Sequence, residues 1–192
     1  MFAQKSDFSS RLFATVCITM FRGVLHMNIY LAGPDVFRAD ALAWAEESRQ
    51  LCAVAGHRAL IPLDAEETTA AGIYLANREL IRRADALLAN LNPFRGCEPD
   101  SGTCVEVGMA LALGKPVIGY VDRAETTAQR VARVAGGKLA QRGGRPIDGA
   151  GWYVEDFGLP LNLMLAVPVT IVVGGLAAAV HALSGQRSVE GA

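Results

Sequence analysis

The stretch that most constrains the fold of this chain is residues 90–120, NLNPFRGCEPDSGTCVEVGMALALGKPVIGY. It begins at the end of an apolar run, passes through a loop rich in proline, glycine and acidic residues, and becomes helical over residues 103–114. An apolar strand at residues 116–120 follows. This order of strand, loop, helix and strand is typical of one turn of a doubly wound α/β sheet.

The rest of the chain repeats this alternation of strands and helices. The hydrophobic pattern predicts further strands at residues 29–32, 58–63, 86–91 and 167–173, and helices at residues 36–55, 70–85, 157–164 (opening at Pro160) and 176–183. We therefore expect a five-stranded parallel sheet with helices on both faces, in three αβα layers. Residues 121–158 are rich in Gly, Arg and Asp, and we expect a long mobile loop or lid there.

Composition indicates one globular domain with a small-molecule partner. The chain has 192 residues, of which 52% are hydrophobic and 19% are charged. A net charge of -1 without a basic stripe argues against a nucleic-acid partner. The four cysteines form no CxxC pair, which argues against a zinc site and fits reduced thiols in a cytoplasm.

The two ends of the chain are harder to assign. Residues 1–26 contain a basic and then an apolar stretch without a small-residue cleavage site, and Met27 directly precedes the first strand. We expect a disordered extension at residues 1–26, a domain at 27–184 and a polar tail at 185–192; a targeting segment at 1–26 is the alternative. The apolar residues 166–183 have the length of a membrane span, but Gly174-Gly175 divides them, which favours a strand and a helix.

Two carboxylates are the strongest candidates for chemistry. Parallel sheets bind ligands beyond the carboxyl ends of their strands, which is where Asp100 and Glu106 fall. Glu106, ionised near a helix N-terminus, is suited to attack an anomeric carbon, and Asp100 with a raised pKa is suited to protonate a leaving group. The structural alternatives are a capping box formed by Thr103 and Glu106, and a solvated turn at Asp100.

Two neutral residues have the same ambiguity. Tyr30 lies in an apolar strand, so its ring belongs to the core or its hydroxyl orients Glu106. Asn162 lies among leucines and methionine, so its amide caps a helix or contacts a ligand.

Four blocks in order resemble the nucleoside 2-deoxyribosyltransferase family, most closely its purine-type members. They are IYLAGPDVF (29–37), LIPLD (60–64), NPFRGCEPDSGTCVEVGMALALGKPV (92–117) and FGLPLNLML (157–165). The resemblance runs from about residue 27 to about residue 173, without 1–26 and much of 121–155. It implies a flavodoxin-like α/β fold. At Asn90 and Asn77 some relatives carry aspartate, which weakens any inference about the base.

The resemblance also implies roles for individual residues. Glu106 becomes the nucleophile at C1′ of a 2′-deoxynucleoside, Asp100 the acid and base toward the nucleobases, and Tyr30 the residue that holds Glu106. Asn162 is implied to reach the sugar 5′-hydroxyl in a neighbouring subunit of a homo-oligomer. The other substrate-binding positions implied by the family motifs are Gly33, Phe37, Asp64, Asn77, Phe94, Ser101, Gly102 and Met164.

Three functions remain open from the sequence. The first is transfer of 2-deoxyribose between nucleobases in nucleoside salvage, with 2′-deoxynucleosides and free bases as partners and without a metal or organic cofactor. The second is an N-glycosidase that uses Glu106 to hydrolyse deoxynucleosides or deoxynucleotides; Arg38 and Ser101 are the nearby candidates for a 5′-phosphate site. The third is a non-catalytic nucleotide-binding module in which Glu106 only caps its helix.

Overall fold

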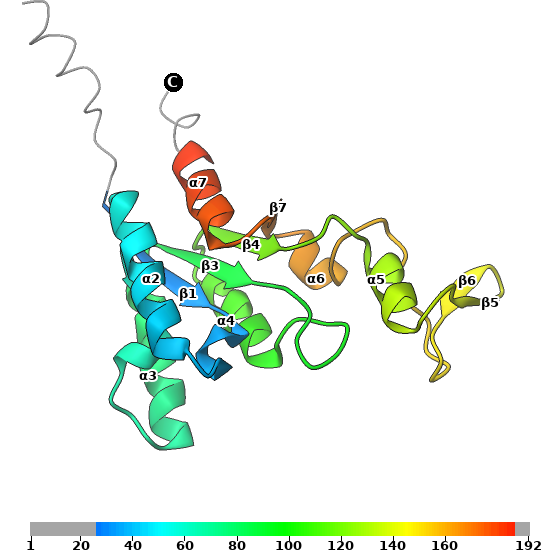
Figure 1. Cartoon of the computed structure of the whole chain (residues 1–192), viewed down its shortest axis with the longest axis horizontal. Coiled ribbons are helices and arrows are strands. Elements are labelled where there is room, and N and C mark those ends of the chain that lie inside the picture. The colour runs from blue at the N-terminus through cyan, green and yellow to red at the C-terminus, as the bar shows by residue number, and fades with distance from the viewer. Residues whose placement is uncertain (1–25, 187–192) are drawn as a thin grey trace, which may run out of the picture.

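A parallel sheet forms the centre of the computed structural model, which describes residues 26–186 (Figure 1). Its strands are β1 (Asn28–Ala32), β2 (Arg58–Leu60), β3 (Ala86–Asn90), β4 (Val117–Val121) and β7 (Thr170–Val173). Every neighbouring pair runs parallel, in the order β2-β1-β3-β4-β7. This is the flavodoxin-like order, so the predicted fold class is confirmed.

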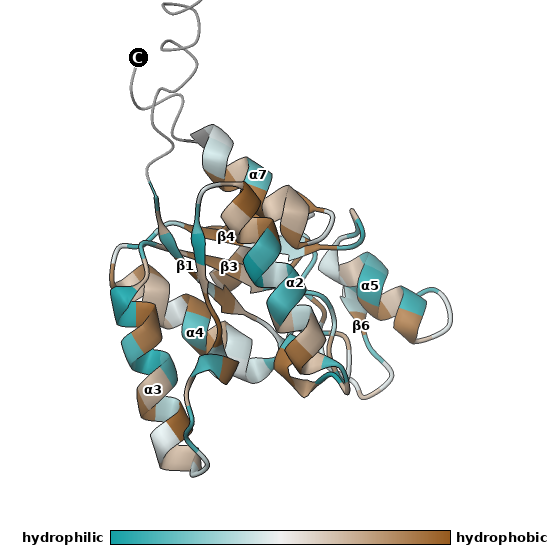
Figure 2. Ribbon diagram, turned by 60° about the vertical axis from the view of Figure 1, so that its left-hand side comes forward, coloured by the Kyte–Doolittle hydropathy of each residue, from teal (hydrophilic) through white to brown (hydrophobic). Residues whose placement is uncertain are grey.

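Helices cover both faces of the sheet. They are α2 (Ala41–Val54), α3 (Ala70–Arg83), α4 (Ser101–Ala112) and α7 (Leu176–Gln186). α2 and α7 pack on one face and α3 and α4 on the other (Figure 1). Successive strand residues serve opposite faces: Leu31 packs toward α2 and α7, whereas Tyr30 packs toward α3 and α4. Because both faces are buried, β3 and β4 are largely apolar in Figure 2.

The first crossover differs from the helix predicted at residues 36–55. A short 3₁₀ helix, η1 (Pro34–Phe37), follows β1, and α2 begins only at Ala41. Arg38 between them has an extended backbone and donates two hydrogen bonds to Asp40. The chain therefore forms a short 3₁₀ turn before the long helix α2. Because η1 directly follows β1, it lies at the carboxyl edge of the sheet.

The second strand is also shorter than predicted. β2 ends at Leu60 rather than at residue 63, and the 3₁₀ helix η2 (Pro62–Asp64) follows. Pro62 has no N–H to donate to a strand ladder, and its fixed φ suits the first turn of a helix.

The prediction of a long loop at residues 121–158 is wrong. This segment contains α5 (Thr127–Val134) and a hairpin of β5 (Ala140–Arg142) and β6 (Arg145–Ile147). Gly143 and Gly144 have φ of 58° and 77°, which is the conformation that a two-residue hairpin turn requires. In Figure 1 the helix and hairpin extend from the right-hand edge of the sheet.

The C-terminal part follows the predicted division around Gly174-Gly175, with β7 before it and α7 after it. The helix expected at Pro160 begins later, as α6 (Leu163–Ala166). α7 continues through Gln186, beyond the predicted start of the tail. Within residues 26–186 no helix combines the length and apolar character needed to cross a membrane. The extension expected at 1–26 lies, except for His26, outside the described residues.

Candidate active site

Tyr30 and Glu106 meet at the carboxyl side of the sheet. Tyr30 lies in β1 with its side chain fully buried on the face covered by α4. Glu106 lies in the second turn of α4 and is partly buried. The Tyr30 hydroxyl donates a hydrogen bond of 2.6 Å to Glu106 Oε1. The predicted contact between strand 1 and the glutamate is therefore present.

The surroundings of Glu106 favour its protonated form. The pKa of Glu106 is raised to about 7; burial is the largest cause, and the nearby charge of Asp100 also contributes to the rise. The hydrogen bond from Tyr30 acts in the opposite direction but is the weaker effect. We expected the helix dipole to keep Glu106 ionised, but the effect of burial on its pKa is larger. Burial, followed by the charge of Glu106, also raises the pKa of Tyr30 well above its ordinary value.

Asp100 is the N-cap of α4. Its Oδ2 accepts hydrogen bonds from Thr103 N at 2.9 Å and from the Thr103 hydroxyl at 3.0 Å. The helix begins at Ser101, earlier than predicted, so a capping box between Thr103 and Glu106 is wrong. Asp100 accepts a hydrogen bond from a backbone N–H in the first turn of α4. The Glu106 side chain does not cap the helix but accepts a hydrogen bond from Tyr30.

An aromatic stack joins the loops after β1 and β3. The rings of Phe37 and Phe94 lie 5.6 Å apart at 13°. The Arg95 guanidinium carbon lies 4.6 Å from the Phe94 centroid and 5.3 Å from that of Phe37. Phe37 is 59% exposed, so the stack presents an open aromatic surface. Arg95 has a φ of 53°, a left-handed conformation that is uncommon for a residue other than glycine.

A chain of amides and carboxylates joins the strand tips on the opposite face from Glu106. Asn90 Nδ2 donates to Asp35 Oδ2 at 2.8 Å, and Asn90 Oδ1 accepts from Asn92 Nδ2 at 2.9 Å. Asn92 Oδ1 accepts from Asp122 N at 2.8 Å. A Cβ on Gly33 would lie 2.8 Å from Asn90 Cβ and 2.9 Å from Asp35 Oδ2, so only glycine fits this tip. Asp35 and Asn92 were not among the site residues predicted from the sequence.

Asp64 and Asn77, two of the predicted substrate-binding residues, differ in whether their side-chain oxygens have hydrogen-bond partners. Asp64 accepts hydrogen bonds from Arg49 Nη2 at 2.5 Å and from Ile61 N at 2.9 Å, so its carboxylate is engaged in closing η2. Asn77 lies in α3, and its buried Oδ1 has no hydrogen-bond partner within the described chain. The Asn77 acceptor is therefore buried and unpaired among the described residues, whereas the Asp64 carboxylate already has two hydrogen-bond donors. The remaining loop positions, Ser101 and Gly102, form the exposed first turn of α4.

Asn162 caps α6, which is one of the two roles predicted for its amide. Its Oδ1 accepts from Met164 N at 3.0 Å, and its Nδ2 donates to Glu155 Oε1 at 2.7 Å. Asn162 lines a hollow together with Glu98 and Pro99, which directly precede Asp100. The Met164 side chain is 72% exposed at this hollow.

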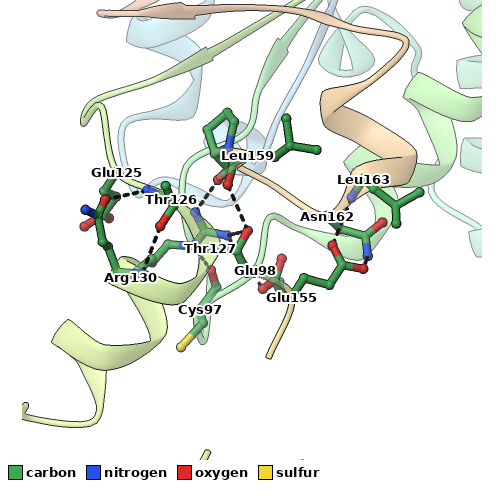
Figure 3. Close-up of polar contacts among 12 residues, drawn as sticks. Cys97, Glu98, Glu125, Thr126, Thr127, Arg130, Glu155, Leu159, Asn162 and Leu163 are labelled. Atoms are coloured by element: carbon green, nitrogen blue, oxygen red, sulfur yellow. Dashed lines mark hydrogen bonds and ion pairs between the residues drawn. The ribbon is translucent and has the colours of Figure 1, made fainter. Parts of the chain in front are cut away.

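Three polar residues bind the segments that precede α4 and α6, and none of them was predicted from the sequence: Thr127, Arg130 and Glu155 (Figure 3). Thr126 and Gln129 form a capping box at the start of α5, and this sequence pattern indicates the helix in advance. Among the described residues, no group of three or more His, Cys, Asp or Glu side chains is placed to hold a metal ion.

The fold and the site define a flavodoxin-like α/β protein with two interacting carboxyl groups at one helix N-terminus. Residues 29–164 match the family model described as nucleoside 2-deoxyribosyltransferase. This span contains Tyr30, Asp100, Glu106 and Asn162. The chain belongs to the nucleoside 2-deoxyribosyltransferase family.

The chain is also similar to individual proteins. A solved 2-desoxiribosyltransferase from Leishmania mexicana is 34% identical with a TM-score of 0.68, covering 82% of this chain and 97% of that one. A 2-deoxyribosyltransferase from Bacillus psychrosaccharolyticus is 25% identical over 51% of this chain and 74% of its own, with a TM-score of 0.42. An uncharacterised protein of Schizosaccharomyces pombe, C191.05c, is 35% identical over 102 residues; the match spans only 48% of that relative and 48% of this chain.

Proposed function

We propose that this chain transfers 2-deoxyribose between nucleobases through a covalent intermediate on Glu106. The observation that carries the proposal is the 2.6 Å hydrogen bond from Tyr30 to Glu106, beside an Asp100 that is near enough to raise the pKa of Glu106. Membership of the family supports deoxyribosyl or N-glycosidic chemistry at this pair.

In the first half-reaction, the ionised Glu106 forms a bond from its free carboxylate oxygen to C1′ of a 2′-deoxynucleoside. The bond from C1′ to the base nitrogen breaks, and its electron pair leaves with the base. Asp100 donates a proton to the departing base. Tyr30 holds Glu106 by one oxygen and thereby directs the other oxygen to the sugar.

In the second half-reaction, a nitrogen of an incoming base attacks C1′ and the bond to Glu106 breaks. Asp100 accepts the proton that this nitrogen loses, which returns both carboxyl groups to their starting states. Two displacements at C1′ retain its configuration. The second step yields a nucleoside only if the incoming base reaches the intermediate before water does.

We propose a purine base for the donor, because the sequence blocks resemble the purine-type members of the family most closely. The aromatic stack of Phe37, Phe94 and Arg95 in the loops after β1 and β3 offers a flat surface to a base. Asn162 Nδ2 carries two hydrogens, of which Glu155 takes one. The other is available for a sugar hydroxyl in a neighbouring subunit, so we propose a homo-oligomer.

The alternative is hydrolysis of a deoxynucleotide, which requires a cation for the 5′-phosphate. Arg38, the candidate for this role, donates from Nε and Nη2 to both carboxylate oxygens of Asp40 at 2.9 Å. Its bidentate fork is thus already occupied, which favours a free nucleoside over a nucleotide.

The test is a base-exchange assay with 2′-deoxyinosine or 2′-deoxyuridine as donor, each with and without adenine. Glu106→Ala and the control Glu79→Gln, an exposed carboxylate of α3, are assayed beside the wild type. We expect 2′-deoxyadenosine only when adenine is present, none with Glu106→Ala, and wild-type rates with Glu79→Gln. Equal release of free deoxyribose with and without adenine indicates a hydrolase, and absence of turnover with every donor contradicts the proposal.

A further inference from the structure

Arg130 of α5 binds two segments of the chain outside its own helix. Its side chain is 3% exposed. Nε donates to Cys97 O at 2.6 Å (Figure 3), and Nη1 donates to Pro160 O at 2.5 Å. Nη2 donates to the Thr127 hydroxyl at 3.4 Å and lies 3.7 Å from Glu98 Oε1. The guanidinium therefore lies between the loop before α4, the helix α5 and the segment before α6.

The two carbonyls that Arg130 binds lie close in sequence to two proposed site residues. Cys97 precedes Asp100 by three residues, and Pro160 precedes Asn162 by two. Thr127 N donates to Leu159 O at 3.0 Å, which adds a backbone bond between α5 and the second segment. Glu155 accepts from Asn162 Nδ2 at 2.7 Å and from Leu163 N at 3.1 Å. The backbones on both sides of the hollow that Asn162 lines are thus fixed by α5 and Glu155.

The composition of this contact is unusual for a purely structural one. A buried guanidinium is costly unless it is fully bonded, and the carboxylate partner of Arg130, Glu98, is 53% exposed. An apolar residue would fill this position of α5 without that cost. An apolar residue would, however, leave the carbonyls of Cys97 and Pro160 without the two donors that the planar guanidinium fork supplies in two directions at once.

We propose that Arg130 is a positioning residue that holds the Asp100 loop in place for proton transfer to the departing base. This inference rests on the proposed function, because it assigns Arg130 a role in the same reaction. Arg130 acts through the backbone of residues 97–100 and does not touch the substrate.

The test compares two donors that differ in their need for a proton. 2′-Deoxyguanosine needs an acid to release its base, whereas 7-methyl-2′-deoxyguanosine carries a positive charge and releases a neutral base without one. Arg130→Lys keeps the charge and loses the fork, so we expect kcat/KM for 2′-deoxyguanosine to fall by about 100-fold and for the methylated donor by less than about three-fold. The matched control is Arg133→Lys on the same helix, whose guanidinium forms an exposed pair with Glu125. It should change neither value.

The ratio of the two donors is independent of how much of a preparation is folded, since both are measured on the same protein. Thr127→Val removes one hydrogen-bond acceptor of Arg130 but keeps the branched shape, and it should shift the ratio in the same direction by less. A wild-type enzyme that turns over neither donor contradicts the proposed function. A working wild type whose Arg130→Lys variant loses both activities equally, or neither, contradicts the role of Arg130 alone.

Discussion

The Tyr30 hydroxyl and Glu106 Oε1 are 2.6 Å apart although the two residues are 76 positions apart in sequence. This contact links a central strand to the helix that begins at Asp100. Two opposing effects meet there, since burial raises the pKa of Glu106 and the hydrogen bond from Tyr30 lowers it. Burial is the larger effect, so the pKa reaches about 7.

Removing the Tyr30 hydroxyl should move the pH dependence of the reaction. With 7-methyl-2′-deoxyguanosine, a donor that needs no acid, only the nucleophile must be ionised, so kcat/KM of the wild type should rise with pH up to about 7. Tyr30→Phe loses the one interaction that lowers the pKa of Glu106, so this rise should shift upward by about one pH unit or more. A pH profile of kcat/KM measures it. An unshifted profile that is merely lower at every pH would show that Tyr30 does not tune Glu106.

The raised pKa of Glu106 also has a consequence for stability. In the folded protein Glu106 has a pKa of about 7, whereas in the unfolded chain it has the ordinary value of 4.5. Between these two pH values the folded state binds more protons than the unfolded state, so the free energy of unfolding falls as pH rises. The amide that replaces the carboxyl group in Glu106→Gln does not titrate, so the variant should gain on the order of 1–3 kcal/mol relative to wild type across this range. Denaturant unfolding of both proteins at the two ends of the range measures the gain. A constant difference would contradict the burial of this charge.

Asp100→Asn separates the structural role of this residue from its chemical one. Asparagine is as good an N-cap as aspartate, so the helix and the free energy of unfolding should change by less than about 1 kcal/mol. Asparagine donates no proton, so kcat for 2′-deoxyguanosine should fall by about 100-fold or more. The methylated donor, which needs no proton, serves as control. Equal losses with both donors would indicate a displaced helix rather than a missing acid.

The aromatic stack should bind the base without taking part in the chemistry. Phe37→Ala removes an exposed ring, so we expect KM to rise by about ten-fold while kcat changes little. The matched control is Trp152→Ala, which removes a ring that is 74% exposed outside the four family blocks and should leave KM unchanged. Steady-state kinetics with a purine donor measures both. A loss in kcat at constant KM would place Phe37 in a different role.

Much of the sheet is predictable because its strands are apolar on both faces. The burial of Tyr30 and Leu31 on opposite faces is what a continuous apolar run between helices requires. The turn at Pro62 and the delayed start of α2 were missed because periodicity alone does not resolve short 3₁₀ turns. In residues 121–158, glycines obscured a helix that the Thr126 and Gln129 capping pattern marks.

The site was only partly predictable for a different reason. Glu106, Asp100 and Tyr30 lie in recognisable motifs, but the capping pattern of Thr103 and Glu106 is the same in sequence whether or not the bond forms. Asp35, Asn92 and Arg130 act through contacts between distant segments, and each is an ordinary surface residue by type. Contacts of this kind follow from the tertiary structure rather than from local pattern.

The most direct test of the account is to look for the covalent intermediate on Glu106. The enzyme is mixed with a 2′-deoxynucleoside in the absence of an acceptor base, quenched in acid, digested, and examined by mass spectrometry beside Glu106→Gln and Asp100→Asn. We expect one deoxyribosyl group on the peptide that contains Glu106, and none on that peptide from Glu106→Gln. Turnover of the donor by the wild type with the group on another residue, or a burst of released base with no adduct on any peptide, would contradict the covalent role of Glu106.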